Sequence, residues 1–218
     1  MLRCAVGRDL VGAEGMILPT TEGGFATIEA DPPWLFRSYA PPAKDGSTYR
    51  RDVEVHYDTM DLATIKAMPI ADIAAKDAHL FLWTTGPHLP QALEVMAAWG
   101  FAYSGVQHTW IKLRRGLNPD QLCVIGDVES ELHMGLGHTS RKNAEFLLLG
   151  RRGNARRLAK DVREVIIAPV REHSRKPDEA YRRIERYCTG PRLSLFSRES
   201  REGWTTWGNE SEKFNGPA

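Results

Sequence analysis

The sequence predicts an α/β fold, a mostly parallel sheet flanked by helices. Short apolar runs alternate with amphipathic, helix-like stretches along the chain, which is the pattern of strands joined by helical connections. The composition is that of a globular domain, with 42% hydrophobic and 26% charged residues. A length of 218 residues suits one sizeable domain and is short for two. We therefore expect one domain over residues 1–210 and a flexible tail over residues 211–218.

The predicted strands are short apolar runs that end at charged residues, glycine or proline. They cover residues 27–30, 78–84, 106–112, 144–149, 165–167, 192–197 and 204–207. The first strand ends at Asp31, because two prolines follow and proline cannot continue the hydrogen-bond ladder of a sheet. The segments 35–60 and 113–143 show no sustained period, and we expect long loops there.

Three stretches have the pattern of helices, over residues 61–75, 87–99 and 177–188. The first is expected to break near Pro69, because proline interrupts a helix. The second places Leu89, Leu93 and Met96 on one helical face. The third begins at Pro177, and two acidic residues follow near the positive end of the helix dipole.

Charge and cysteine content exclude several classes of protein. The formal net charge is +1, which does not indicate a nucleic-acid-binding protein by itself but leaves room for a local basic patch. Three scattered cysteines do not suggest a disulfide framework, and they favour a reducing compartment. No stretch approaches the roughly 18 apolar residues of a membrane span, and residues 1–9 are too broken by charge and glycine for a signal peptide. We expect a cytoplasmic protein that contacts no membrane.

The turn Asp31-Pro32-Pro33-Trp34 is the candidate active site, because ligands of α/β sheets lie beyond the carboxyl ends of strands. The exocyclic amine of a nucleobase is a poor nucleophile, since its lone pair is delocalised into the ring. The Asp31 carboxylate and the Pro32 carbonyl can accept its two N–H groups and stabilise the positive charge of the transition state. Trp34 offers an aromatic face on which an extruded base can stack. The tetrapeptide alone fits a proline-rich strand end with a core tryptophan equally well.

The turn and several further blocks of sequence resemble a known family. Asp31-Pro32-Pro33-Trp34 resembles the motif of S-adenosylmethionine-dependent amino-methyltransferases that act on adenine. The chain as a whole resembles the MT-A70 family over residues 25–210, as a single-domain member of bacterial or phage type. The blocks that carry the resemblance, in family order, are residues 57–60, 80–85, 98–101, 110–112, 135–138, 141–148, 173–178, 195–198 and 203–210.

The resemblance implies a permuted, Rossmann-like methyltransferase fold, in which the catalytic strand comes first and the cofactor-binding strand, residues 193–197, comes near the end. It implies transfer of a methyl group to the N6 amino group of adenine in nucleic acid. We expect DNA rather than RNA, because the chain is compact and lacks the extra domains of RNA-modifying relatives. An RNA adenosine methyltransferase and a non-catalytic, nucleic-acid-binding partner subunit stay open as alternatives, although the intact motif favours an enzyme. Relatives commonly work as dimers, so a homodimer is possible.

The resemblance also assigns the cofactor site residue by residue. Lys176 matches the lysine that meets the methionine carboxylate of S-adenosylmethionine, Arg198 a residue at its ribose, and Asn209 a residue at its nucleoside part. Glu210 stands where some members have glutamine, and Asp31 is expected beside the cofactor. Ser194 departs from the family, because many members carry an acid there. We expect no metal, because the seven histidines show no metal-ligand spacing with cysteine and a sulfonium needs none.

Nucleic-acid contacts are expected from basic residues. Residues 141–163 contain eight basic side chains against two acidic ones, which is the kind of cluster that binds phosphates, although a solvated charged face is the plain alternative. The loops 35–57 and 112–118 also carry Arg, Lys and Tyr near the candidate turn. The individual candidates are Tyr57, Lys112, Arg141, Lys142, Arg151 and Arg152.

Overall fold

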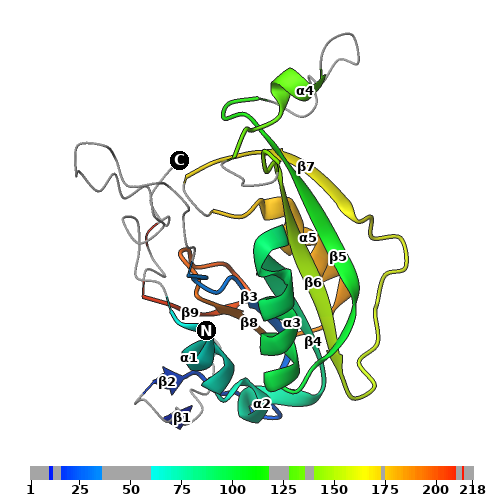
Figure 1. Cartoon of the computed structure of the whole chain (residues 1–218). Helices are drawn as coiled ribbons and strands as arrows, with labels where there is room; N and C mark the ends of the chain where they lie inside the picture. Colours follow the sequence, from blue (N-terminus) through cyan, green and yellow to red (C-terminus); the bar gives the residue numbers. More distant parts are fainter. Residues whose placement is uncertain are drawn as a thin grey trace, which may run out of the picture.

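The computed structural model describes residues 10–11, 16–35, 60–117, 128–135, 140–172, 175–209 and 213. Within this part of the chain, seven strands form one sheet in the order β7-β5-β6-β4-β3-β8-β9. The strands are β3 (Phe25–Ala30), β4 (Ala74–Thr84), β5 (Ala102–Leu113), β6 (Ala144–Arg152), β7 (Val165–Pro169), β8 (Arg192–Leu195) and β9 (Thr205–Trp207). Figure 1 shows helix α3 on the near side of this sheet and helix α5 behind it.

The predicted α/β fold with a mostly parallel sheet is confirmed. Strand β6 runs antiparallel to both of its neighbours, β4 and β5. The other neighbouring pairs are parallel. Each strand predicted from an apolar run is present, with ends that differ by a few residues. The separate antiparallel pair β1 (Leu10–Val11) and β2 (Ile17–Leu18) was not predicted, because two-residue strands leave no periodic pattern.

The helices described are α1 (Leu62–Ala67), α2 (Ile70–Ile73), the 3₁₀ helix η2 (Gly86–His88), α3 (Leu89–Ala98), α4 (Val128–Glu131) and α5 (Asp178–Tyr187). The predicted break at Pro69 separates α1 from α2. Helix α3 ends before Gly100, whose φ of +80° lies in the left-handed region that favours glycine. None of the helices in the described residues is long and apolar enough to cross a membrane.

The face that α3 buries differs in part from the predicted one, which named Leu89, Leu93 and Met96. Leu89 and Leu93 are each 36% exposed, whereas Ala92, Val95 and Met96 are buried against the sheet. The rotation is fixed at the carboxyl end of the helix, because the buried Trp99 indole N–H donates to the Ile65 carbonyl at 2.8 Å. Apolar residues occur on more than one side of this helix, so the sequence pattern alone could not choose the buried face.

Alternation along β3 sends its side chains into two different layers. Ile28 and Ala30 pack in the core that also contains residues of α3. Phe81 and Trp83 of β4 pack in a second core with Ala180 and Ile184 of α5. Thr27, Glu29 and Asp31 alternate with the first set and therefore project toward the layer of α5.

Strand β3 lies at the switch point of the sheet. Its Ala30 pairs with Leu82 of β4 on one side and with Leu195 of β8 on the other, and both pairings are parallel. The carboxyl ends of three strands therefore meet at one edge, and ligands of open α/β sheets bind at such a place. Asp31 follows directly. The permuted order is confirmed, since the early strand β3 and the late strand β8 are neighbours.

Candidate active site

A chain of alternating charges lies at this edge of the sheet. The Lys176 ammonium nitrogen is 2.9 Å from Asp31 Oδ2 and 3.0 Å from Glu145 Oε2. The other Glu145 oxygen, Oε1, accepts a hydrogen bond from the Lys112 ammonium at 2.5 Å. Asp31 follows β3, Glu145 begins β6, Lys112 is on β5 and Lys176 precedes α5. The fold thus brings together four charged residues from distant parts of the chain.

Burial and pairing together set the charges of this cluster. Lys176 is only 7% exposed. Burial alone would lower the pKa of Lys176, but Asp31 and Glu145 outweigh it and hold that pKa above its ordinary range. Burial alone would raise the pKa of Glu145, but Lys176 and Lys112 lower it to about 2. Lys176 and Glu145 are therefore both ionised at neutral pH.

A cavity of about 560 Å³ opens beside the cluster, and a smaller one of about 30 Å³ lies nearby. Asp31, Arg175 and Lys176 line both, so the ion pair of Asp31 and Lys176 lies in the wall between them. The larger cavity is strongly cationic. Its basic lining residues are Lys112, Arg114, Arg115, Arg171, Arg175 and Lys176, against the acidic Asp31, Glu145 and Glu172.

The turn after β3 is held by its own backbone. The Asp31 N–H donates to the Leu195 carbonyl at 3.4 Å, which ties the turn to the end of β8. The Pro32 carbonyl accepts the Trp34 N–H at 2.8 Å. A carbonyl oxygen has two lone pairs, so Pro32 can still accept a second donor, as its predicted role requires.

Trp34 lies deeper than a surface stacking platform would. It is 5% exposed, and its indole N–H donates to the Trp83 carbonyl at 3.1 Å. Its ring stacks on His88 with the centroids 5.9 Å apart. Trp34 also lines the larger cavity. Stacking of a base on Trp34 stays a prediction, and the structure adds a second role for the ring, which is to hold the turn against β4.

A buried carboxylate occupies the neighbouring part of β3. Glu29 is 1% exposed, and its Oε2 accepts a hydrogen bond from the Ser194 hydroxyl at 2.6 Å. Its Oε1 has no hydrogen-bond partner among the described residues. Burial is the largest cause that raises the pKa of Glu29 to about 7, and Asp31 adds to it, while Ser194, Lys176 and Arg201 act in the opposite direction.

The protonation of Glu29 predicts a pH-dependent stability. The folded protein binds this proton more tightly than the unfolded chain, so the free energy of unfolding falls as pH rises. We expect Glu29 to lower it by about 3 kcal/mol across the window from its ordinary pKa of 4.5 to about 7. Urea unfolding at pH 4 and pH 8 measures this loss in the wild type. The variant Glu29→Gln should lose about 3 kcal/mol less than the wild type, and equal losses would contradict the assignment.

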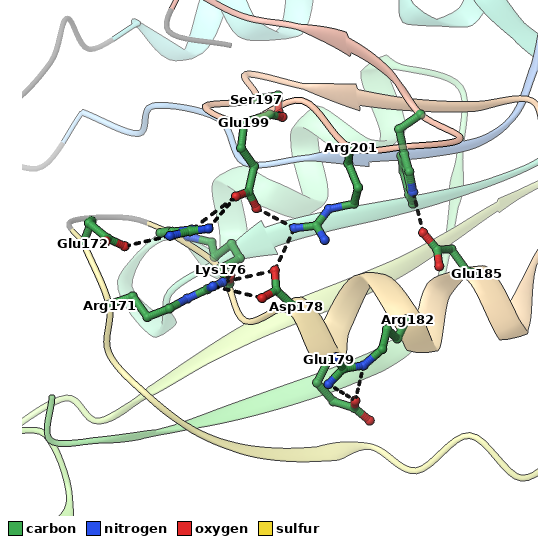
Figure 2. Close-up of polar contacts among 12 residues, drawn as sticks. Arg171, Glu172, Lys176, Asp178, Glu179, Arg182, Glu185, Ser197, Glu199 and Arg201 are labelled. Carbon is green, nitrogen blue, oxygen red and sulfur yellow. Dashed lines mark hydrogen bonds and ion pairs between the residues drawn. The ribbon is translucent and has the colours of Figure 1, made fainter. Parts of the chain in front are cut away.

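A network of ion pairs fixes the segment that carries Lys176, as Figure 2 shows. Arg171 pairs with Asp178 at 2.9 Å and also donates to the backbone carbonyl of Lys176. Arg201 bridges Asp178, at 2.8 Å, and Glu199. The network therefore joins the start of α5 to the loop after β8, and these two segments border the small cavity.

The same loop after β8 adopts an unusual backbone. Phe196 has a φ of +59°, which a bulky side chain rarely adopts. Its ring packs edge-on against Trp207 with the centroids 5.6 Å apart. The Ser197 N–H donates to the Trp207 carbonyl at 3.0 Å. Such a strained, well-supported turn at a strand end is a frequent feature of ligand sites.

Comparison with known proteins identifies the family. The MT-A70 family model matches residues 25–210. The chain belongs to the MT-A70 family. The Type II methyltransferase M.MunI of a Mycoplasma species is 27% identical over 199 residues, which cover 85% of this chain and 77% of that protein.

Eukaryotic relatives are similar over a smaller share of their length. The N(6)-adenosine-methyltransferase subunit METTL3 of Danio rerio is 30% identical over 194 residues, 86% of this chain and 28% of that protein. The human N(6)-adenosine-methyltransferase catalytic subunit METTL3 is 29% identical over 194 residues, with the same shares. The chain therefore spans roughly a quarter of the length of these proteins.

Some of the cofactor residues expected from the MT-A70 resemblance line the small cavity. Lys176 and Arg198 line the small cavity together with Asp31. Asn209 is exposed and follows β9. A Cβ at Gly208 would come within 2.6 Å of the Ser197 carbonyl oxygen, so this segment runs against the loop that carries Arg198. Glu210 lies outside the described residues, as does the tail 211–218 apart from Lys213.

The nucleic-acid candidates are divided between the two ends of the sheet. Lys112 lines the larger cavity, and Arg141 and Lys142 precede β6 at that end. Arg151 and Arg152 lie at the opposite end of β6, where they donate to the carbonyls of Ala155 at 2.9 Å and Ala71 at 2.5 Å. The structure therefore does not bring this pair to the site. Tyr57 lies outside the described residues.

Sequence reasoning missed two carboxylates of the site, Glu145 and Glu29. Each is a carboxylate inside a strand-forming apolar run, and that was the signal available. No group of three or more His, Cys, Asp and Glu residues suited to hold a metal ion occurs in the described part of the chain.

Proposed function

We propose that this chain transfers a methyl group from S-adenosylmethionine to the N6 amino group of adenine, in DNA rather than RNA. The observation that carries the proposal is the position of Asp31, ion-paired with Lys176 in the wall between two cavities. Membership of the MT-A70 family and the names of the relatives support it. The preference for DNA is supported by the similarity of this chain to the Type II methyltransferase M.MunI, which the match covers to 77%.

The residues around the small cavity fit the proposed cofactor. S-adenosylmethionine supplies a methyl group on a sulfonium and carries a carboxylate, an ammonium group and a nucleoside. Lys176 offers a cation for the carboxylate, and Oε1 of the buried Glu29 is an acceptor without a partner among the described residues. The MT-A70 resemblance assigns the nucleoside part to Arg198, Asn209 and Glu210. The donors and acceptors present therefore match the charges of the cofactor.

The chain's own residues are arranged to activate an amine. The Asp31 carboxylate accepts one N–H of the adenine amine, and the Pro32 carbonyl accepts the other. Both groups stabilise the positive charge that develops on the amine nitrogen as its bond to the methyl carbon forms. Lys176 holds the Asp31 carboxylate in place through their ion pair. The methylated amine then has one proton in excess, and Asp31 is placed to accept it.

Methyl transfer to matched substrates tests the proposal. Unmethylated DNA and RNA of one sequence are incubated side by side with methyl-labelled S-adenosylmethionine. We expect label in DNA and little in RNA. More label in RNA would reverse the proposed substrate. Label in neither would contradict the enzyme and favour the alternative of a non-catalytic partner subunit.

The cationic lining of the larger cavity suits a phosphate backbone. Arg114 and Arg115 follow β5 and line this cavity. Arg114 pairs with Glu131 at 3.0 Å, and Arg115 donates to the Arg171 carbonyl at 2.6 Å, so both side chains are held at the rim. We propose that they bind phosphates beside the target base. The proposed phosphate-binding pair thus shifts from Arg151 and Arg152 to these two arginines.

Neutralising the two rim arginines should weaken DNA binding and flatten its dependence on salt. The double variant Arg114→Gln with Arg115→Gln is expected to reduce the slope of log affinity against log salt by about 0.9 for each phosphate that is no longer neutralised. Fluorescence anisotropy at several salt concentrations measures the slope. The matched control is Arg156→Gln with Arg157→Gln, two exposed arginines beyond the far end of β6. An equal change in both double variants would show that only net charge matters.

A further inference from the structure

Glu29 is a buried acid with one oxygen that the described residues leave unsatisfied. A buried carboxylate without a full set of partners is costly, so its presence calls for a ligand or a structural reason. Glu29 Oε2 is held by the Ser194 hydroxyl from the neighbouring strand β8. Glu29 and Ser194 are direct partners in the parallel register of β3 and β8. The strand pair therefore fixes the carboxyl group, while Oε1 stays available.

The carboxyl group faces a cavity of suitable size. Glu29 and Ser194 line the small cavity of about 30 Å³, together with Lys176 and Arg198. A volume near 30 Å³ holds a group of the size of a water molecule or an ammonium ion. Two other acids line this cavity: Asp31 is paired with Lys176, and Glu199 is paired with Arg175 and Arg201. Glu29 is therefore the acid here that can take a further cation.

Lys176 and Glu29 give the small cavity one cationic and one acidic group, which suits a zwitterionic ligand such as the amino-acid end of S-adenosylmethionine. Lys176 is the cation that the proposed function gives to the carboxylate of the cofactor. The same amino-acid end carries an α-ammonium group one carbon away, which needs an acceptor on the adjacent wall. Asp31 is engaged by Lys176 at 2.9 Å and is reserved for the adenine amine.

We propose that Glu29 binds the α-ammonium group of S-adenosylmethionine, with Ser194 as the residue that orients it. The proposal rests on the proposed function, because it deepens the cofactor site. It also gives a reason for Ser194, which stands where an acid was expected from the family resemblance. In this chain the carboxylate is that of Glu29 on the neighbouring strand β3, and the Ser194 hydroxyl orients it through a hydrogen bond.

Two ligands separate this role from a purely structural one. S-adenosylhomocysteine and its analogue without the α-amino group differ only in the proposed contact. A charge-assisted hydrogen bond corresponds to roughly a tenfold to hundredfold change in affinity. By titration calorimetry we expect the wild type to bind the desamino analogue more weakly by about that factor. Glu29→Gln should bind both ligands about equally, at the affinity that the wild type shows for the analogue.

The matched control is Glu199→Gln, which neutralises another acid of the same cavity. It should weaken both ligands by the same factor and keep the discrimination between them. The comparison of the two ligands on the wild type needs no variant, so it stands even where Glu29→Gln folds poorly. Thermal melting of each variant monitors the fold.

The outcomes separate the two proposals. A wild type that binds neither ligand overturns the proposed function and this inference together. A wild type that binds both ligands equally overturns only the role of Glu29. The role of Glu29 is also overturned if Glu29→Gln still binds S-adenosylhomocysteine more tightly than the desamino analogue. It is overturned as well if this variant loses affinity for both ligands by the same factor. A water molecule in the cavity would likewise leave the two ligands indistinguishable.

Discussion

The variant Asp31→Asn is expected to transfer the methyl group about 10²–10³-fold more slowly than the wild type at saturating cofactor. Asparagine keeps the size and shape of the side chain, but it removes the charge and can present an N–H where an acceptor is needed. The loss should appear in the chemical step, because the methionine part of the cofactor is assigned to Lys176 and Glu29. Single-turnover kinetics measure the step directly, and calorimetry with S-adenosylhomocysteine checks that cofactor affinity changes little.

Glu145→Gln is the matched control for this prediction. Asp31 and Glu145 both pair with Lys176, at 2.9 Å and 3.0 Å, so both variants remove one carboxylate from the same ammonium group. Only Asp31 is proposed to contact the amine. We expect a much smaller loss of rate from Glu145→Gln. Equal losses would mean that charge balance around Lys176, rather than contact with the amine, sets the rate.

The variant Lys176→Met should destabilise the fold by about 3–5 kcal/mol, because it removes the ammonium group that two carboxylates share. Lys176 is 7% exposed and makes both ion pairs at once. Glu145 keeps Lys112 as a partner, whereas Asp31 loses the ammonium group that balances its charge. Urea unfolding of the variant measures the cost.

A double variant assigns that cost to the ion pair. Adding Asp31→Asn to Lys176→Met removes the carboxylate charge that Lys176 would have balanced, and we expect it to restore part of the lost stability. If the stability losses of the two single variants simply add in the double variant, the two residues do not interact. Lys176→Met alone should also bind S-adenosylhomocysteine more weakly. The Lys176 ammonium group, which this variant lacks, is assigned to the carboxylate of the ligand.

Much of the fold could be predicted because its strands are apolar runs with clear ends. The run 27–30 stops at a proline pair, and the structure ends β3 at Ala30. The helix from Pro177 also starts where proline and two acids indicate. The predicted face of α3 was right for Met96 and wrong for Leu89 and Leu93. The bond from Trp99 to the Ile65 carbonyl helps to set the rotation, and it joins residues far apart in the sequence.

The site was harder to predict, because it depends on pairs across strands. The Asp31 turn and Lys176 carry motifs that a resemblance can locate, and the structure places both at one edge of the sheet. Glu145 lies on β6 in the middle of a basic stretch, so its partner could not be chosen without the sheet order. The same stretch led us to expect Arg151 and Arg152 among the nucleic-acid contacts. Strand β6 carries them seven and eight residues away from Ala144 at its cavity end, which is about 25 Å along an extended strand.

Mass spectrometry of the nucleosides in DNA after incubation with enzyme and S-adenosylmethionine tests the central claim most directly. It identifies both the base and the atom that receive the methyl group. We predict N6-methyl-deoxyadenosine with the wild type, and its loss with Asp31→Asn. A methyl group on N4 of cytosine, or undiminished N6-methyl-deoxyadenosine with Asp31→Asn, would contradict the proposed mechanism.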